Sequence, residues 1–330
     1  MLFPNNSLRN LLVFSCILSL FYNCSKDDID NEITDENGII TNPLPNPDPA
    51  QNSEKAAAIA LYNTYYVASK TASTDPKWNG DVASCMVGNA PKEVRDKILM
   101  RIHYFRKATG LHNTLTENSA KSTQAMQAAL MMHANASKGL SHNPDTNWTC
   151  YTEDGANGAA SSLLTTAENA EAIDSYMRDN GTNNGPVGHR RWLYLPKLEE
   201  VGIGNTSSYN AIYVLGSSGS TLPDGAPEFI SWPPKGYIPV KFAYDRWSFS
   251  YPKANFDNTK INLKDTSGNA VPLTVLPIVN GFGDNTIVWE PDGIQTTITT
   301  DTRYTVTLEN VIIDNEARTF NYDIIFFTID

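Results

Sequence analysis

One segment of the chain reads Val187-Gly188-His189-Arg190-Arg191-Trp192, and an earlier one reads Leu140-Ser141-His142-Asn143-Pro144. Together they hold two of the five histidines in the sequence. Each of these histidines follows a small residue and lies beside turn-forming residues, a setting in which an imidazole can face a cleft. Two imidazoles that meet across a groove often begin a divalent-metal site or an acid/base pair. The alternative is that either histidine only packs within the fold.

The N-terminus has the pattern of a secretory signal peptide, residues 1–23. Its apolar stretch, residues 11–22, is too short to span a bilayer as a mature helix. Cys24 follows, which resembles a bacterial lipoprotein signal, and Ser25-Lys26-Asp27-Asp28 resembles the surface-export signal of Bacteroidetes lipoproteins. Asn23 departs from the small residue usual before such a cysteine, so a secretory peptide without lipid is the alternative. We expect an exported protein, anchored through Cys24 in the outer membrane or at the cell surface.

Residues 24–54 are predicted to form a disordered tether. This segment is acidic at first and then rich in Asn and Pro, as in Pro43-Leu44-Pro45-Asn46-Pro47. Such a composition cannot bury enough apolar area to offset the entropy lost on ordering. We expect a semi-extended linker that holds the folded part away from a membrane.

The charge balance limits the possible partners. The net charge of −11 becomes −12 without residues 1–23, because that removes Arg9 and no acid. So acidic a chain argues against binding to nucleic acid or anionic lipid. Arg190 and Arg191 could still form a small basic patch. The expected partners are therefore the membrane, through the N-terminal lipid, and an unidentified ligand or surface partner.

The cysteines point to an oxidising compartment. Cys16 lies in the signal peptide and Cys24 at the lipidation position, which leaves Cys85 and Cys150 in the folded region. Two remaining cysteines in an exported protein most simply pair with each other. Such a bridge would close a loop of about 65 residues and stabilise the fold by a few kcal/mol.

Hydrophobic periodicity divides the folded region into two parts. Helices are predicted over residues 53–68, 91–109, 119–137 and 170–179, and short strands over 200–204 and 211–215. Beyond Pro227, strands are predicted over 240–244, 248–251, 260–264, 271–276, 286–289, 303–308 and 322–328. So many short strands separated by turn residues favour an antiparallel sandwich. We expect an immunoglobulin-like β-sandwich over residues 228–330, with the role of a spacer or docking domain.

Several blocks of sequence, taken in order, carry a family resemblance. They are the two histidine segments above, Arg101-Ile102-His103-Tyr104-Phe105-Arg106, Ala129-Leu130-Met131-Met132 and Trp148-Thr149-Cys150-Tyr151-Thr152. Together they resemble bacterial members of the CAP superfamily, which includes cysteine-rich secretory proteins, antigen 5 proteins and pathogenesis-related proteins. The resemblance covers about residues 56–215 and implies a CAP domain over residues 55–222. The expected fold class is α+β, a CAP-type α-β-α sandwich followed by the all-β immunoglobulin-like sandwich.

The resemblance also implies a cleft with two histidines and two acids. His142 and His189 match the histidines, and Asp179 stands in place of one glutamate. The other glutamate falls near Ser161, where no carboxylate is present. His142, His189 and Asp179 could hold a divalent metal such as zinc. The serine, however, removes an acid that hydrolysis would use as a general base, so no residue is assigned a catalytic role.

Other candidate groups are few. Glu153 and Glu168 lie near the cleft segments in sequence and could replace the missing acid. His103 is predicted to pack or cap locally. The sequence has no Gly-x-Ser-x-Gly elbow, His-Glu-x-x-His helix or phosphate-binding glycine loop, which disfavours a serine hydrolase, a zincin and a nucleotide enzyme.

Three functions agree with these observations. The first is a non-enzymatic surface protein whose CAP cleft binds a lipid, another small molecule or a divalent metal, as the resemblance implies. The second is a metal-dependent hydrolase that acts on peptide or envelope material through His142, His189 and Asp179. The third is a structural or adhesive envelope lipoprotein in which the histidines only hydrogen-bond the loops of the cleft.

Overall fold

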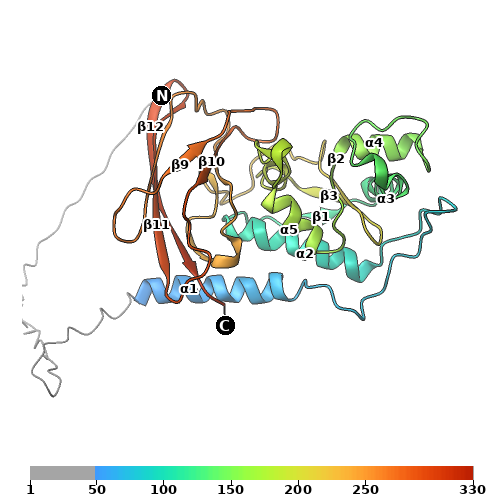
Figure 1. Cartoon of the computed structure of the whole chain (residues 1–330), viewed down its shortest axis with the longest axis horizontal. Helices are drawn as coiled ribbons and strands as arrows, with labels where there is room; N and C mark the ends of the chain where they lie inside the picture. The colour runs from blue at the N-terminus through green and yellow to red at the C-terminus, as the bar shows by residue number, and fades with distance from the viewer. Residues whose placement is uncertain (1–48, 330) are drawn as a thin grey trace, which may run out of the picture. The chain divides into compact units, whose positions relative to one another are not determined.

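The computed structural model describes residues 49–329 of the chain (Figure 1). The predicted signal peptide, the lipidation at Cys24 and most of the predicted tether lie outside these residues. The first helix begins at Pro49, so the end of the segment predicted as tether, up to residue 54, is helical. Between residues 49 and 329, no helix combines the length and the apolar character needed to cross a membrane.

The helices of the first part largely follow the predicted pattern. They are α1 (Pro49–Leu61), α2 (Lys92–Ala108), α3 (Ser119–Ala134), α4 (Glu153–Ser161), α5 (Glu171–Arg178) and α6 (Gly188–Leu193). Shorter helical segments cover Tyr62–Val67, Ala136–Lys138, Thr182–Asn184 and Val240–Phe242. Neither α4 nor α6 was predicted, since α4 is rich in Gly and Ala and α6 is only six residues long. Thr152 caps α4 by accepting a hydrogen bond from the N–H of Gly155 at 2.9 Å.

The strands are short in the first part and longer near the C-terminus. They are β1 (Thr116–Glu117), β2 (Ser162–Thr165), β3 (Glu200–Asn205), β4 (Asn210–Tyr213), β5 (Ile230–Trp232), β6 (Gly236–Pro239), β7 (Trp247–Ser250), β8 (Lys260–Lys264), β9 (Leu273–Val275), β10 (Thr286–Pro291), β11 (Thr302–Ile313) and β12 (Glu316–Phe327). The strand predicted over 240–244 is wrong. Pro239 ends β6 with a φ of −56°, which suits the start of a helical turn, and Val240–Phe242 forms a 3-10 helix.

A four-stranded sheet with the order β1-β3-β4-β2 supports the helices of the first part. Helix α3 lies directly against it, through the small-residue face that contains Ala125 and Ala129. Gly204 on β3 faces the backbone of Ala125 so closely that an added Cβ would overlap it, and Gly158 on α4 faces the backbone of Gln124 in the same way. Small residues therefore let α4, α3 and β3 approach one another, which places the segments that border the cleft.

The C-terminal region contains two four-stranded sheets, largely antiparallel. Their orders are β5-β7-β10-β9 and β6-β12-β11-β8, with β6 parallel to β12. Trp247 and Trp289 are fully buried, and Trp247 contacts Tyr304 and Phe326 of the second sheet edge to face. This aromatic packing joins the two sheets.

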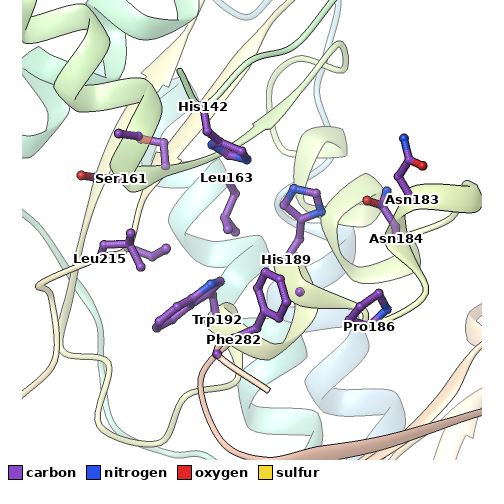
Figure 2. A pocket seen from close by; sticks show the side chains of 15 residues that line it. His142, Ser161, Leu163, Asn183, Asn184, Pro186, His189, Trp192, Leu215 and Phe282 are labelled. Atoms are coloured by element: carbon purple, nitrogen blue, oxygen red, sulfur yellow. The ribbon is translucent and has the colours of Figure 1, made fainter. Parts of the chain in front are cut away.

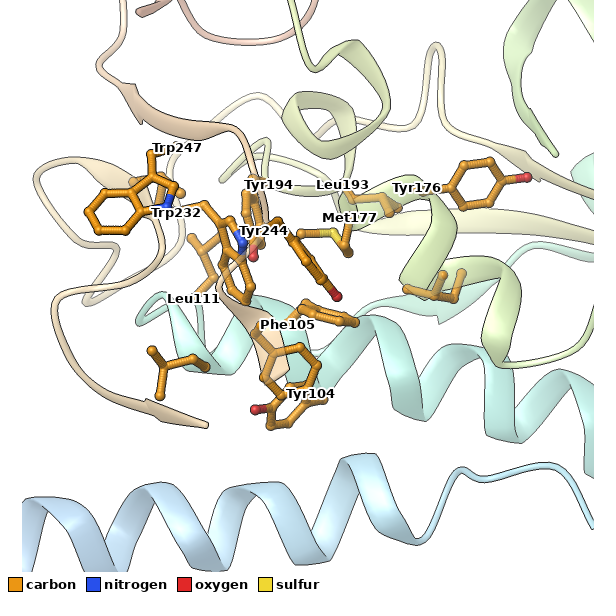
Figure 3. Close-up of a cluster of buried hydrophobic side chains, with 14 of the residues drawn as sticks. Tyr104, Phe105, Leu111, Tyr176, Met177, Leu193, Tyr194, Trp232, Tyr244 and Trp247 are labelled. Carbon is orange, nitrogen blue, oxygen red and sulfur yellow. The ribbon is translucent and has the colours of Figure 1, made fainter. Parts of the chain in front are cut away.

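An aromatic core also joins the C-terminal region to the helices (Figure 3). Phe105 on α2 packs edge to face against Trp232 and Phe242, with ring centroids 5.5 Å apart in both pairs. The ring centroid of Tyr194, which follows α6, lies 6.0 Å from that of Trp232. Residues 49–329 accordingly belong to one compact unit. The boundary predicted between 222 and 228 stays a prediction, but the regions on its two sides share a core.

The predicted disulfide is confirmed. Cys85 and Cys150 are bonded, with an S–S distance of 2.06 Å and a separation of 65 residues. The bridge ties the loop before α2 to the loop before α4, so it encloses α2 and α3.

His103 provides a test of stability against pH. It accepts a hydrogen bond at Nε2 from the N–H of Leu115 at 3.0 Å, and burial, aided by the charges of Lys107 and Arg106, lowers its pKa to about 4. The folded pKa lies below the unfolded value of about 6.5, so the unfolded chain binds the proton first. The neutral His103 ring therefore contributes to the free energy of unfolding above pH 6.5, and this contribution is lost as the pH falls toward 4. His103→Gln should therefore lose less stability than the wild type between pH 6.5 and 4, as measured by urea unfolding. If the free energy of unfolding falls equally steeply with pH in the wild type and the variant, the lowered pKa of His103 is contradicted.

Candidate functional site

His142 and His189 line the same cleft (Figure 2). Both border two cavities, of about 320 Å³ and 570 Å³. The smaller one has apolar walls formed by Leu163, Trp192 and Phe282 together with neighbouring residues. The structure thus brings together the two histidines that the sequence singled out.

The imidazole of His142 is held through its Nδ1 atom. This nitrogen lies 2.8 Å from the carbonyl oxygen of Ala159 on α4. A carbonyl can only accept, so Nδ1 carries the hydrogen. In the neutral ring, Nε2 then has the free lone pair, available to a hydrogen-bond donor or a metal ion.

His189 is held in the same way, by Asp179. Its Nδ1 lies 2.7 Å from Oδ1 of Asp179, and its backbone N–H donates to Oδ2 at 2.9 Å. Oδ2 also accepts from the N–H of Arg190 at 3.3 Å. The Asp179 side chain is fully buried. Asp179 therefore caps α6 and sets the ring orientation of His189, again leaving Nε2 free.

The metal site expected at His142, His189 and Asp179 stays a prediction. Both Asp179 oxygens accept hydrogen bonds from α6, so the direct role of Asp179 in this structure is to hold His189. Between residues 49 and 329, no group of three or more His, Cys, Asp or Glu side chains is arranged to hold a metal ion. Asp179 is better described as a residue that positions His189.

Ser161 lines the smaller cavity at the C-terminal end of α4. Its carbonyl oxygen accepts from the N–H groups of Val214 and Leu215 at 3.0 and 3.2 Å, which fixes the end of α4 to the strand region opposite. Neither Glu153 nor Glu168 lines either cavity beside the histidines. Ser161 therefore lines the smaller cavity at the position where the resemblance implied an acid, and no carboxylate lines that cavity.

The C-terminal region supplies one wall of the cleft, which the sequence did not predict. Gly281 and Phe282 belong to the loop of residues 276–285 between β9 and β10, and both line the smaller cavity. Arg191 holds this loop, since its Nη1 donates to the carbonyl of Val279 at 2.7 Å and its Nη2 to that of Asp284 at 2.9 Å. Its guanidinium also lies 5.5 Å from the centroid of the Phe282 ring.

The basic patch considered for Arg190 and Arg191 is wrong. Both side chains are buried, with exposed fractions of 0% and 3%, because backbone carbonyl groups surround them. Arg246 adds a third link from the C-terminal region by donating to the carbonyl of Asp179 at 2.8 Å. These arginines join the cleft to the C-terminal sheets and are not a binding surface for anions.

Two further polar residues of the cleft were also missed. Asn183 and Asn184 follow the turn after α5 and line both cavities. Asn184 donates to the carbonyl of Asn180 at 2.7 Å, which leaves its amide oxygen to accept another bond. Asparagines in a turn are more often structural than functional, so the sequence carried no signal for this role.

Comparisons with known proteins agree with part of this picture. Residues 99–216 match the model of the family described as CAP, Cysteine-rich secretory protein family. A search of curated proteins found no match. Among solved structures, the chain is similar to PcoC, a methionine rich copper resistance protein from Escherichia coli, with 18% identity and a TM-score of 0.22 over 29% of this chain and 93% of that one. A likeness with so low a TM-score carries no argument.

Proposed function

Since residues 99–216 form a CAP domain, we propose that this protein is an exported, lipid-anchored surface protein whose CAP cleft binds a small ligand without transforming it. The observation that carries the proposal is the pair of imidazoles, each held through Nδ1 and each with a free Nε2 at one cleft. The term secretory in the family description agrees with the signal peptide expected at residues 1–23. The C-terminal region, expected to be immunoglobulin-like, would complete the cleft and present it.

The lining of the smaller cavity indicates an uncharged ligand. No Asp, Glu, Lys or Arg is among its lining residues. The polar side chains among them are the two histidines, Asn183, Asn184, Ser161, Ser162 and Trp192. Beside apolar walls, such groups recognise hydroxyl or amide groups on a largely apolar molecule. A charged ligand would lose its hydration in this cavity without gaining a partner of opposite charge.

The proposal is tested by NMR titration of the histidine rings. Neutral small molecules that bind should shift the ring resonances of His142 and His189 together and leave those of His112 and His133 unchanged. Ala160→Trp fills the cleft from an exposed position on α4 and should weaken binding at least tenfold, about 1.4 kcal/mol. Asn157→Trp, on the same helix and away from the cavity, is the matched control. Binding that shifts neither histidine, or that both variants weaken alike, would exclude this cleft.

Zinc titration separates binding from metal-dependent hydrolysis. With only two imidazole ligands available, the full-length protein should bind zinc weakly. One tightly bound zinc ion per chain, lost in both His189→Ala and Asp179→Ala, would instead favour the hydrolase. The loss in Asp179→Ala would follow either from direct ligation or from loss of the bond that orients the His189 ring.

The anchor is tested separately, by Cys24→Ser. This change removes the thiol that would carry the lipid, and the protein should move from the membrane fraction to the soluble fraction. Retention of the variant in the membrane fraction would contradict lipid attachment at this position.

A further inference from the structure

A third cavity, of about 460 Å³, lies between α1, α2 and β6. Its walls are largely apolar and come from Ala57, Ala58 and Leu61 on one side and from Ile238 and Pro239 on the other. None of its lining residues borders the cleft of His142 and His189. Its volume falls in the range of small-molecule sites. We call it the α1 groove.

The hydroxyl group of Tyr104 is the unusual feature of this groove. Tyr104 is 1% exposed, and its ring packs against Tyr66, Phe105 and Phe242 at the edge of the aromatic core nearest α1 (Figure 3). Its hydroxyl makes no hydrogen bond with any residue between 49 and 329. Burial raises the pKa of Tyr104 well above its usual value, so the hydroxyl remains a donor. The hydroxyl therefore borders the groove with its donor unused, and can donate to an acceptor on a ligand.

Positive charge gathers around the same groove. Lys107 lies one turn after Tyr104 on α2, so the two side chains share a helix face. Lys107 lies 5.5 Å from the ring centroid of Tyr65, and neither it nor Lys235 forms an ion pair with an acid in the described part of the chain. Glu54 is the acid among the lining residues. Two lysines without acidic partners beside an apolar groove, in a chain of net charge −11, favour an anionic head group.

We propose that the α1 groove binds a small organic carboxylate with an apolar body. The apolar body lies against the alanines of α1 and the end of β6. The carboxylate accepts from the Tyr104 hydroxyl and pairs with Lys107, so that the unpartnered donor and the unpaired charge are satisfied together. This second site goes beyond the proposed function of the histidine cleft and does not depend on it.

The probe is octanoate, titrated calorimetrically into the full-length protein. We expect binding at one site, with 1-octanol and octylammonium at least tenfold weaker, since the first lacks the charge and the second reverses it. Lys107→Gln should weaken octanoate binding about tenfold, and Tyr104→Phe several-fold, because each removes one partner of the carboxylate.

A matched pair of variants guards against an indirect effect on folding. Ala57 and Ala56 are both exposed on α1, but only Ala57 lines the groove. Ala57→Trp should abolish octanoate binding, whereas Ala56→Trp and His189→Ala should leave it unchanged. The proposal is overturned if octanoate does not bind, if 1-octanol binds as tightly, or if the two alanine variants behave alike. A loss with His189→Ala would place the octanoate in the histidine cleft instead.

Discussion

Replacing Arg190 by alanine is expected to lower the free energy of unfolding by about 3 to 5 kcal/mol. The guanidinium is fully buried. Its Nε donates to the carbonyl of Met177 at 2.7 Å, its Nη1 to that of Arg246 at 2.9 Å and its Nη2 to that of Arg178 at 3.3 Å. Burial lowers the pKa of Arg190 to about 10, so it is still charged at neutral pH. Truncation would leave buried acceptors without a donor and open a cavity between α6 and β7.

Urea unfolding of the full-length protein measures this loss. Arg190→Met keeps most of the volume and should fall between the wild type and the alanine variant. The control is Arg318→Ala, which removes a half-exposed ion pair with Glu228 and should cost far less than Arg190→Ala. A loss for Arg190→Ala as small as that of the control would show that the buried bonds contribute little to stability.

Removing the disulfide is expected to cost about 4 kcal/mol. The bridge between Cys85 and Cys150 closes a loop of 65 residues, and in its absence the unfolded chain gains the conformational freedom of that loop. The double variant Cys85→Ser, Cys150→Ser should therefore unfold at a much lower urea concentration.

Reduction provides the matched control for this prediction. Adding a thiol reductant to the wild type should shift its unfolding midpoint toward that of the double variant, while the variant itself should not respond. If reductant leaves the wild type unchanged although the thiols become free, the loop entropy is not what the bridge contributes.

The sequence predicted those helices and strands whose buried face is visible in the periodicity of their own residues. Helix α3 has a small-residue face that is visible in the sequence, and this face packs on β3. Helix α4 was missed because Gly155 and Gly158 make it a poor helix on its own. Gly158 is required because the α3 backbone approaches it closely. This contact belongs to the tertiary structure and cannot be read from the sequence of α4.

The sequence likewise indicated some residues of the candidate site and not the roles of others. His142 and His189 could be found because they stand in distinctive segments, and the structure places both at one cleft. The role of Asp179 depends on which N–H groups its oxygens accept from, and sequence does not record this. A pair of adjacent arginines reads as a solvated patch, yet carbonyl groups from the C-terminal region bury Arg191.

Because Phe282 forms part of the cleft wall, a shortened protein without it would present a different pocket to ligands. A fragment that ends at residue 216 keeps both histidines and loses the loop of residues 276–285, so its pocket would lack the wall formed by Gly281 and Phe282. Ligands selected with such a fragment would suit a pocket that the whole chain does not have. In evolution, the same arrangement lets a hairpin far along the gene change length or composition and so reshape this wall, while the sheet of the first part stays as it is.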